Sequence, residues 1–300
     1  MPDSSFKCGY VALVGRPNVG KSTLMNRLLG QKISITSRRP QTTRHRILGI
    51  KTEADYQIVY VDTPGIHSET PRAMNRYLNK AALETLHDVD VIVLLVEDVR
   101  WLPDDQWVLE KLQTIKSPVI LALNKIDRLD NRESLLPQIK ALSEKMHFSD
   151  VIPLSARRGE NVEVLEKSLT RLLPESVPFF PEDQITDRSE RFLAAEMVRE
   201  KLFRKLGKEI PYGLTVEIEH FKHEGKTLHI HALILIEKSS QKPIVIGNKG
   251  KLLKEVGSEA RKDMQQMFDV KVFLNLWVKV KEGWADDERA LQSLGYHNDL

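Results

Sequence analysis

The sequence predicts an α/β domain with a mostly parallel sheet and helices on both faces, followed by a smaller α+β domain. Between residues 10 and 173, apolar strand-like runs alternate with helical patterns, which is typical of a parallel sheet covered by helices. Three prolines between residues 174 and 181 then interrupt both patterns. From residue 189 to 234 a helical stretch is followed by two alternating strand patterns, which indicates a second layer of sheet and helix.

The composition is that of a two-domain protein with local basic patches. The chain has 300 residues, 41% of them hydrophobic, which allows one large core and one smaller core. Its formal net charge is only +3, but basic residues gather at 38–46 and 242–254, and such patches favour a polyanionic partner. Cys8 is the only cysteine, so no intrachain disulfide can form and we expect a reducing cytoplasm. No apolar run approaches the ~20 residues of a membrane span, and residues 1–9 lack a secretory signal pattern.

The first predicted strand, residues 10–14, leads into the sequence Gly-Arg-Pro-Asn-Val-Gly-Lys-Ser at 15–22. This spacing is that of a phosphate-binding loop, whose backbone N–H groups and following helix N-terminus face phosphate oxygens. Lys21 is expected to reach the β- and γ-phosphates, and the Ser22 hydroxyl to hold Mg²⁺. The helix is predicted to end before Gly30. The residues expected to bind phosphate are Gly15, Arg16, Pro17, Asn18, Val19, Gly20, Lys21, Ser22 and Thr23.

Two further segments are expected to sense the phosphates. Residues 33–45 form a long connection rich in Ser, Thr, Arg and Pro, and such a loop in a compact domain is usually functional, here as a first switch. Strands predicted over 48–55 and 57–61 form an antiparallel edge, and residues 66–76 are the second switch. Four residues of the predicted site, Asp62, Thr63, Pro64 and Gly65, lie between the strand at 57–61 and the second switch. Asp62 is expected behind Ser22 as an outer-sphere partner of Mg²⁺, and Gly65 lets the chain approach the γ-phosphate.

Base recognition is predicted at the ends of the next strands. The strand at 119–123 ends in Asn124-Lys125-Ile126-Asp127, and the Asp127 carboxylate can accept two hydrogen bonds from guanine N1–H and N2–H₂. Adenine offers no such donor pair, so a buried carboxylate there selects GTP over ATP. Asn124 is expected to hold the loop and meet the base edge, and the Lys125 stem to cover a face of the ring. A strand at 151–154 leads to Ser155 and Ala156, whose backbone N–H can donate to guanine O6. Helices over 76–87 and 161–173 and a core strand over 91–96 complete the domain.

The second domain reads as helix, strand, strand, helix, helix, strand. An amphipathic helix over 189–206, with Phe192, Ala195, Val198, Leu202 and Leu206 inward, precedes strands at 214–219 and 228–234. A Gly-x-x-Gly loop follows between two helical segments, and its glycines let the backbone approach a nucleic-acid backbone while its lysines neutralise phosphate. The alternative is a purely structural helix–turn–helix. The residues expected to bind single-stranded RNA are Ile246, Gly247, Asn248, Lys249, Gly250 and Lys251.

The motifs at 15–22, 62–65, 124–127 and 155–156 resemble those of a translation-factor-class GTPase. With Gln-Thr-Thr-Arg-His-Arg at 41–46 and the second domain, the whole chain resembles the Era family, bacterial TrmE-Era-EngA-type GTPases with a C-terminal type II KH domain. On this resemblance the domains are a P-loop GTPase domain at 1–174, a linker at 175–187, a KH domain at 188–281 and a tail helix at 282–300.

The resemblance also implies function and partners. It implies that Lys21, Thr43 and Gly65 act in catalysis and that Thr43 coordinates Mg²⁺, with Thr42 as the alternative. It further implies GTP hydrolysis, binding of the 3′ end of 16S ribosomal RNA, a role in 30S subunit assembly, and peripheral contact with the inner membrane from the cytoplasm. DNA is not an expected partner. Asn18 is similar to the residue that holds K⁺ in related GTPases, and the alternative is that it only stabilises its turn.

Ile66 departs from the Ras pattern, in which a glutamine at this position orients the attacking water. Because isoleucine has no hydrogen-bonding group, we expect slow intrinsic hydrolysis, helped by a backbone-held water. Two other functions remain open from the sequence: an RNA-modification GTPase, and a nucleotide-gated RNA-binding or membrane scaffold whose turnover is incidental.

Overall fold

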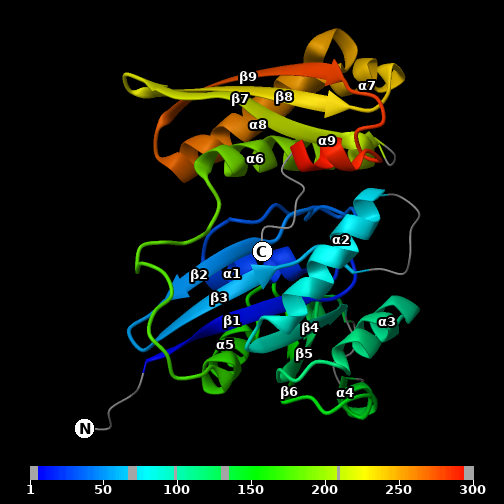
Figure 1. Ribbon diagram of the computed structural model, residues 1–300, viewed down its shortest axis with the longest axis vertical. Helices are drawn as coiled ribbons and strands as arrows, with labels where there is room; N and C mark the ends of the chain where they lie inside the picture. The colour runs from blue at the N-terminus through cyan, green and yellow to red at the C-terminus, as the bar shows by residue number, and fades with distance from the viewer. Residues whose placement is uncertain (1–5, 67–72, 98–99, 130–134, 208–209, 294–300) are drawn as a thin grey trace. The chain divides into compact units, whose positions relative to one another are not determined.

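The structure is a computed structural model that describes residues 6–66, 73–97, 100–129, 135–207 and 210–293 (Figure 1). The chain divides into two compact units. The first contains most of the chain up to Asp187. The second contains the chain from Arg188, together with the short segment Ser37–Thr42 and, among the described residues, Ala73 and Met74.

The first unit is built on a six-stranded sheet in the order β2-β3-β1-β4-β5-β6. Only the edge pair β2–β3 is antiparallel, and the other neighbouring strands are parallel, which confirms the predicted mostly parallel sheet. The central strands are buried along almost their whole length, as expected for a sheet covered on both faces. The strands are β1 (Lys7–Val14), β2 (Ile47–Thr52), β3 (Tyr56–Asp62), β4 (Val91–Glu97), β5 (Val119–Asn124) and β6 (Asp150–Leu154).

Helices cover both faces of this sheet (Figure 1). α1 and α5 contact each other on one face, while residues of α2, α3 and α4 join the apolar core on the other face. α1 ends just before Gly30, as predicted, whereas the helix expected over 76–87 already begins at Ala73 and finishes in a 3₁₀ turn, η1 (Thr85–His87). The helices are α1 (Lys21–Leu29), α2 (Ala73–Glu84), α3 (Pro103–Leu112), α4 (Leu135–Ser143) and α5 (Val162–Leu172).

The proline-containing segment at 175–187 packs along the first unit. Its Ile185 carbonyl accepts a hydrogen bond from Ile50 N at 2.9 Å, on the free edge of β2. The Gln57 side chain accepts from Phe180 N at 3.0 Å. These contacts belong to the first unit itself, so the segment is part of that unit's surface up to Asp187.

The second unit has a three-stranded sheet in the order β7-β8-β9, with β7–β8 antiparallel and β8–β9 parallel. Helices α6 and α8 pack against one face of this sheet and bury a single apolar core (Figure 1). The order of elements is the predicted helix, strand, strand, helix, helix, strand. The elements are α6 (Glu190–Lys205), η3 (Ile210–Gly213), β7 (Leu214–Glu224), β8 (Thr227–Ile236), η4 (Ser239–Gln241), α7 (Lys242–Ile246), η5 (Asn248–Gly250), α8 (Lys251–Phe268), β9 (Lys271–Val280) and α9 (Glu288–Ser293).

The buried surface of α6 differs from the predicted inward face. Phe192 and Ala195 are only half-buried, and the core positions are Ala194, Met197, Val198, Leu202 and Leu206. The helix also buries charged side chains that amphipathic periodicity cannot reveal. Arg199, 1% exposed, donates to Glu196 Oε1 at 2.6 Å and to the Thr42 carbonyl at 2.5 Å within the same unit. The charged residues buried on α6 are Glu196, Arg199, Glu200 and Lys201.

No helix in the described part of the chain combines the length and the apolar character needed to cross a membrane.

Candidate functional site

The sheet order brings the predicted nucleotide motifs to one edge of the first unit. Asp62 and Asn124 are the last residues of β3 and β5, while the phosphate loop and Ser155 directly follow β1 and β6. These four strands are parallel to one another. In open α/β sheets this edge is where ligands bind. Residues 67–72 of the predicted second switch lie outside the described residues.

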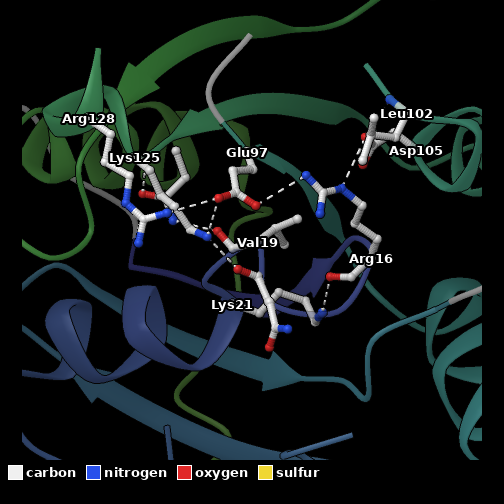
Figure 2. A network of polar contacts seen from close by, with 10 residues as sticks. Arg16, Val19, Lys21, Glu97, Leu102, Asp105, Lys125 and Arg128 are labelled. Carbon is white, nitrogen blue, oxygen red and sulfur yellow. Dashed lines mark hydrogen bonds and ion pairs between the residues drawn. The ribbon is translucent and has the colours of Figure 1, made fainter. Parts of the chain in front are cut away.

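Lys21 lies at the base of the phosphate loop and is 6% exposed. Its Nζ donates to the carbonyl oxygen of Gly15 at 2.9 Å. It also donates to the carbonyl oxygen of Arg16 at 3.1 Å (Figure 2). Burial lowers the pKa of Lys21 to about 8, against the opposing effect of the Asp62 carboxylate. A charged ammonium at this depth is stabilised by an anion, so the loop suits a phosphate group.

Asn124 joins three loops of the site. Its Nδ2 donates to Val19 O at 2.8 Å, and its Oδ1 accepts from Lys125 N at 2.8 Å and from Ala156 N at 3.0 Å. Gly20 has φ 109°, and a Cβ there would lie 2.3 Å from Asn124 Nδ2, so only glycine fits beside the amide. The Ala156 N–H that was predicted to meet guanine O6 therefore has a protein acceptor in this structure.

Hydroxyl and carboxylate oxygens gather around Asp62, which is fully buried. Its Oδ2 accepts from Ser22 Oγ at 2.7 Å and Ser34 Oγ at 2.6 Å, and Thr43 Oγ1 lies 2.9 Å from Ser22 Oγ. Burial raises the pKa of Asp62, although the hydroxyls of Ser34 and Ser22 and the charge of Lys21 oppose this effect.

The second carboxylate oxygen, Asp62 Oδ1, is buried and has no hydrogen-bond partner among the residues that the structure describes. A buried orphan oxygen beside hydroxyl groups is what a hard cation satisfies, so this set of residues fits Mg²⁺. Among the residues that the structure describes, no three His, Cys, Asp or Glu side chains come together as metal ligands.

The two candidate switch threonines differ in what they contact. Thr43 faces Ser22 and Asp62, at 2.9 and 3.4 Å. The Thr42 hydroxyl instead bonds within its own loop, to Ser37 Oγ at 2.6 Å and Arg39 O at 2.7 Å. The geometry favours Thr43 as the metal ligand.

Gly65 and Ile66 lie directly against the phosphate loop. A Cβ on Gly65 would lie 2.7 Å from Pro17 Cα, and Ile66 N donates to Gly15 O at 3.2 Å. The Ile66 side chain is fully buried. Its position agrees with its apolar character, and it offers no hydrogen bond to a water molecule.

Asp127 lies at the surface of the base-recognition edge, in the 3₁₀ turn η2 (Ile126–Arg128). Ser155 Oγ donates to its Oδ1 at 2.7 Å, and this hydrogen bond lowers the pKa of the carboxyl. Arg27 of α1 holds the neighbouring loop, because its Nε donates to Ala156 O at 3.2 Å. The carboxylate is thus kept ionised and oriented, as an acceptor for two guanine donors requires.

Several residues of this edge were missed by the sequence reasoning. Asn26 Oδ1 accepts from Ile33 N and Ser34 N, both at 2.9 Å, and so fixes the start of the first switch. Glu97 ends β4 beside the phosphate loop. The sequence signal for Glu97 was available, since it is an acid at the C-terminal end of a parallel strand next to β1.

The Gly-x-x-Gly loop of the second unit is exposed at the N-terminus of the long helix α8. Asn248, Lys249 and Lys251 are exposed, while a Cβ on Gly247 would lie 2.6 Å from Leu252 Cβ. Gly247 N donates to Pro243 O at 2.8 Å, which closes α7 just before the loop. Exposed lysines at the positive end of a helix suit a phosphate backbone.

Two family descriptions match the chain, one in each unit. The family described as 50S ribosome-binding GTPase matches residues 10–125, and the KH domain family matches residues 209–285.

Similar full-length proteins extend this result to almost the whole chain. The GTPase Era of Marinobacter nauticus is 63% identical over 289 residues, covering 96% of this chain and 95% of that protein. The GTPase Era of Ectopseudomonas mendocina is 60% identical over 290 residues, covering 97% of each.

Two crystal structures share the fold at a TM-score of 0.94 and 38% identity, each covering 98% of this chain and 100% of the other. One is Era in complex with MgGDPNP and nucleotides 1506–1542 of 16S ribosomal RNA, and the other is an Aquifex aeolicus Era variant bound to GDP·AlF₄⁻.

Proposed function

Because this chain belongs to the Era family of GTPases, we propose that it is a GTP-hydrolysing switch that binds the 3′ end of 16S ribosomal RNA and acts in 30S subunit assembly. The hydrolytic activity belongs to the first unit and the RNA-binding activity to the KH domain of the second unit. The observation that carries the first activity is the set of oxygen ligands around Asp62, next to a phosphate loop.

Ser22, Thr43 and Asp62 would hold Mg²⁺, which neutralises charge on the β- and γ-phosphates when it is bound. Lys21 adds a point charge to the same phosphates, at the cost of its two bonds to loop carbonyls. Asp127, kept ionised by Ser155, accepts from the guanine edge and selects GTP. These groups bind and orient the nucleotide; none of them takes a proton from water.

Backbone groups would orient the attacking water, because the buried Ile66 side chain cannot form a hydrogen bond to it. We propose slow intrinsic hydrolysis, stimulated by K⁺ held with the help of Asn18, which is exposed in the phosphate loop and has φ 67°. Hydrolysis is measured in KCl and in NaCl at equal ionic strength, with wild type and Asn18→Ala. Equal rates of the wild type in the two salts would remove the K⁺ proposal.

The RNA-binding half of the proposal rests on the exposed lysines of the Gly-x-x-Gly loop. The experiment measures affinity for a short single-stranded RNA matching the ribosomal 3′ end, with a GTP analogue or GDP bound and across salt concentrations. Lys249→Ala and Lys251→Ala should each weaken binding and reduce the salt slope by about 0.7, the value for one phosphate contact on a single strand. Lys262→Ala, an exposed lysine further along α8, is the matched control. Unchanged affinity in both loop variants would refute the placement of the RNA.

A difference in RNA affinity between the GTP-analogue and GDP states would show that the two activities are coupled. Equal affinities would mean that hydrolysis regulates another partner instead. The rate of multiple-turnover GTP hydrolysis, measured with and without RNA, then decides whether hydrolysis is part of the function or incidental to RNA binding.

We also propose that the protein works in the cytoplasm and contacts the inner membrane peripherally. The support is the basic loop of the second unit, since lysines are attracted to anionic headgroups. Co-sedimentation with vesicles of anionic and of neutral lipid is the test, and binding to neither would refute membrane contact.

A further inference from the structure

One carboxylate at the nucleotide edge is surrounded by three cations. Glu97, the last residue of β4, lies with Oε1 2.8 Å from Lys125 Nζ and 3.0 Å from Arg128 Nη1, and with Oε2 3.2 Å from Arg16 Nη2 (Figure 2). Its side chain is only 17% exposed. Although burial raises the pKa of Glu97, hydrogen bonding and charge from Lys125, with the charges of Arg16 and Arg128, lower it below its ordinary value.

The cations come from two different ligand-binding loops. Arg16 belongs to the phosphate loop after β1, and Lys125 to the base-recognition loop after β5. β4 lies between these two strands in the sheet, so its last residue is the one placed to reach both. Glu97 therefore ties the two loops together from the strand that separates them.

Lys125 is held on two sides. Its Nζ also donates to Asn18 O at 2.7 Å, so the side chain reaches the phosphate loop as well as Glu97. Its backbone has φ 71°, a left-handed conformation that non-glycine residues rarely adopt. The stem that would cover the guanine ring is thus fixed at its base by the backbone and at its tip by Glu97 and Asn18.

Arg16 has a second carboxylate partner, whereas within the described ranges of the chain the Lys125 ammonium pairs with Glu97 alone. Its Nε lies 3.3 Å from Asp105 Oδ2, and Asp105 is fully buried at the start of α3, where it also accepts from Leu102 N at 3.0 Å (Figure 2). Removal of Glu97 leaves Arg16 paired to Asp105. It leaves Lys125 with no carboxylate among the partners that its ammonium has here.

We propose that Glu97 is a positioning residue for guanine nucleotides, acting through Lys125 to hold the base-recognition loop against the phosphate loop. This inference rests on GTP and GDP binding by the first unit, and the wild-type protein in the same assay checks that premise separately. A charge-assisted pair that is already made before the ligand arrives reduces the ordering needed on binding. Its loss is expected chiefly in the dissociation rate.

The test compares Glu97→Gln with wild type for release of a fluorescent GDP analogue. Glu97→Gln keeps the shape and removes the charge. It should release GDP about ten-fold faster, as expected when the charge-assisted contact that holds Lys125 becomes neutral. At saturating GTP the hydrolysis rate should stay within about two-fold while KM rises, because Glu97 touches no reacting atom. Glu97→Asp keeps the charge and should recover most of the affinity. Glu53→Gln, a half-exposed carboxylate paired with Lys51 at 3.8 Å, is the matched control.

A double-mutant cycle tests whether Glu97 acts on nucleotide binding through Lys125. Lys125→Met keeps the stem without the ammonium, and in this background Glu97→Gln should change GDP release by less than about two-fold. The same ten-fold effect in both backgrounds would overturn the assignment to Lys125. GDP release by Glu97→Gln within two-fold of wild type would overturn the positioning role. A lower melting temperature of the unliganded protein with unchanged GDP release would also overturn it, because that is the signature of a role in stability alone.

Discussion

The Asn124 side chain gives the sharpest prediction for the architecture of the nucleotide site. It is 2% exposed and makes three hydrogen bonds, to Val19 O, Lys125 N and Ala156 N. Asn124→Ala removes all three and leaves the buried Val19 carbonyl and the buried Ala156 N–H without their partner. Each unsatisfied buried group costs about 1–3 kcal/mol, so the range is about 2–6 kcal/mol. We expect about 2 kcal/mol, the middle of the range for one unsatisfied group, since water entering the vacated space can satisfy the other.

The measurement is equilibrium urea unfolding, following the transition that GDP displaces to higher urea, because ligand binding identifies the unfolding of the first unit. GDP affinity should fall as well, because the phosphate loop and the loop after β6 lose their common anchor. Gln113→Ala is the matched control: it also removes a carboxamide, at an exposed position of the first unit just after α3, and should alter stability by less than about 0.5 kcal/mol. A loss below about 1 kcal/mol in Asn124→Ala, with unchanged GDP affinity, would refute the argument from buried hydrogen bonds.

Three further predictions follow from the same edge of the sheet. Gly65→Ala places a Cβ 2.7 Å from Pro17 Cα, so a loop must shift, and hydrolysis at saturating GTP should fall at least about ten-fold. Gly207→Ala is the control, because an added Cβ there meets no atom of the described residues within 4 Å, its chain neighbours aside, and the rate should stay unchanged. Equal rates in both variants would contradict the packing argument. Ser34→Ala removes a 2.6 Å hydrogen bond to Asp62 Oδ2 and should raise the Mg²⁺ concentration that half-saturates hydrolysis; an unchanged Mg²⁺ titration would show that Ser34 does not support the metal site. Because burial lowers the pKa of Lys21 to about 8 in the unliganded protein, and phosphate favours the charged form, GDP binding should take up a proton above that pH and weaken as pH rises. Calorimetry in two buffers of different ionisation enthalpy measures this uptake, and no uptake near pH 9, about one unit above that pKa, would contradict the role of Lys21.

The lowered pKa of Lys21 also makes the stability of the unliganded protein depend on pH. The unfolded lysine still holds its proton at pH values where the folded one has lost it, so the unfolded state binds more protons in that window. The unliganded protein should therefore gain stability as pH rises from about 8 towards the ordinary lysine pKa.

The sequence by itself determined the chemistry of the nucleotide site and the order of the elements. The motifs Gly15–Ser22, Asp62–Gly65 and Asn124–Asp127 locate the turns that follow three strands to within a few residues. Strand-like apolar runs that alternate with helical patterns indicate parallel strands joined by crossover helices. Since parallel strands end at one edge of a sheet, motifs at the ends of such strands are expected to lie together, and the structure places them there.

Tertiary structure alone decided which side chains support those motifs. Ser34 reaches Asp62 across 28 residues, and Glu97 reaches Arg16 across 81. On α6 the predicted inward face was partly wrong, because Arg199 is buried by contacts with residues that no helical period reveals. The physical reason is the same in each case. The local sequence determines whether a residue forms a turn, a strand or one face of a helix. Its burial and its hydrogen-bond or ion-pair partners depend on residues far along the chain, which the sheet order and the packing bring next to it.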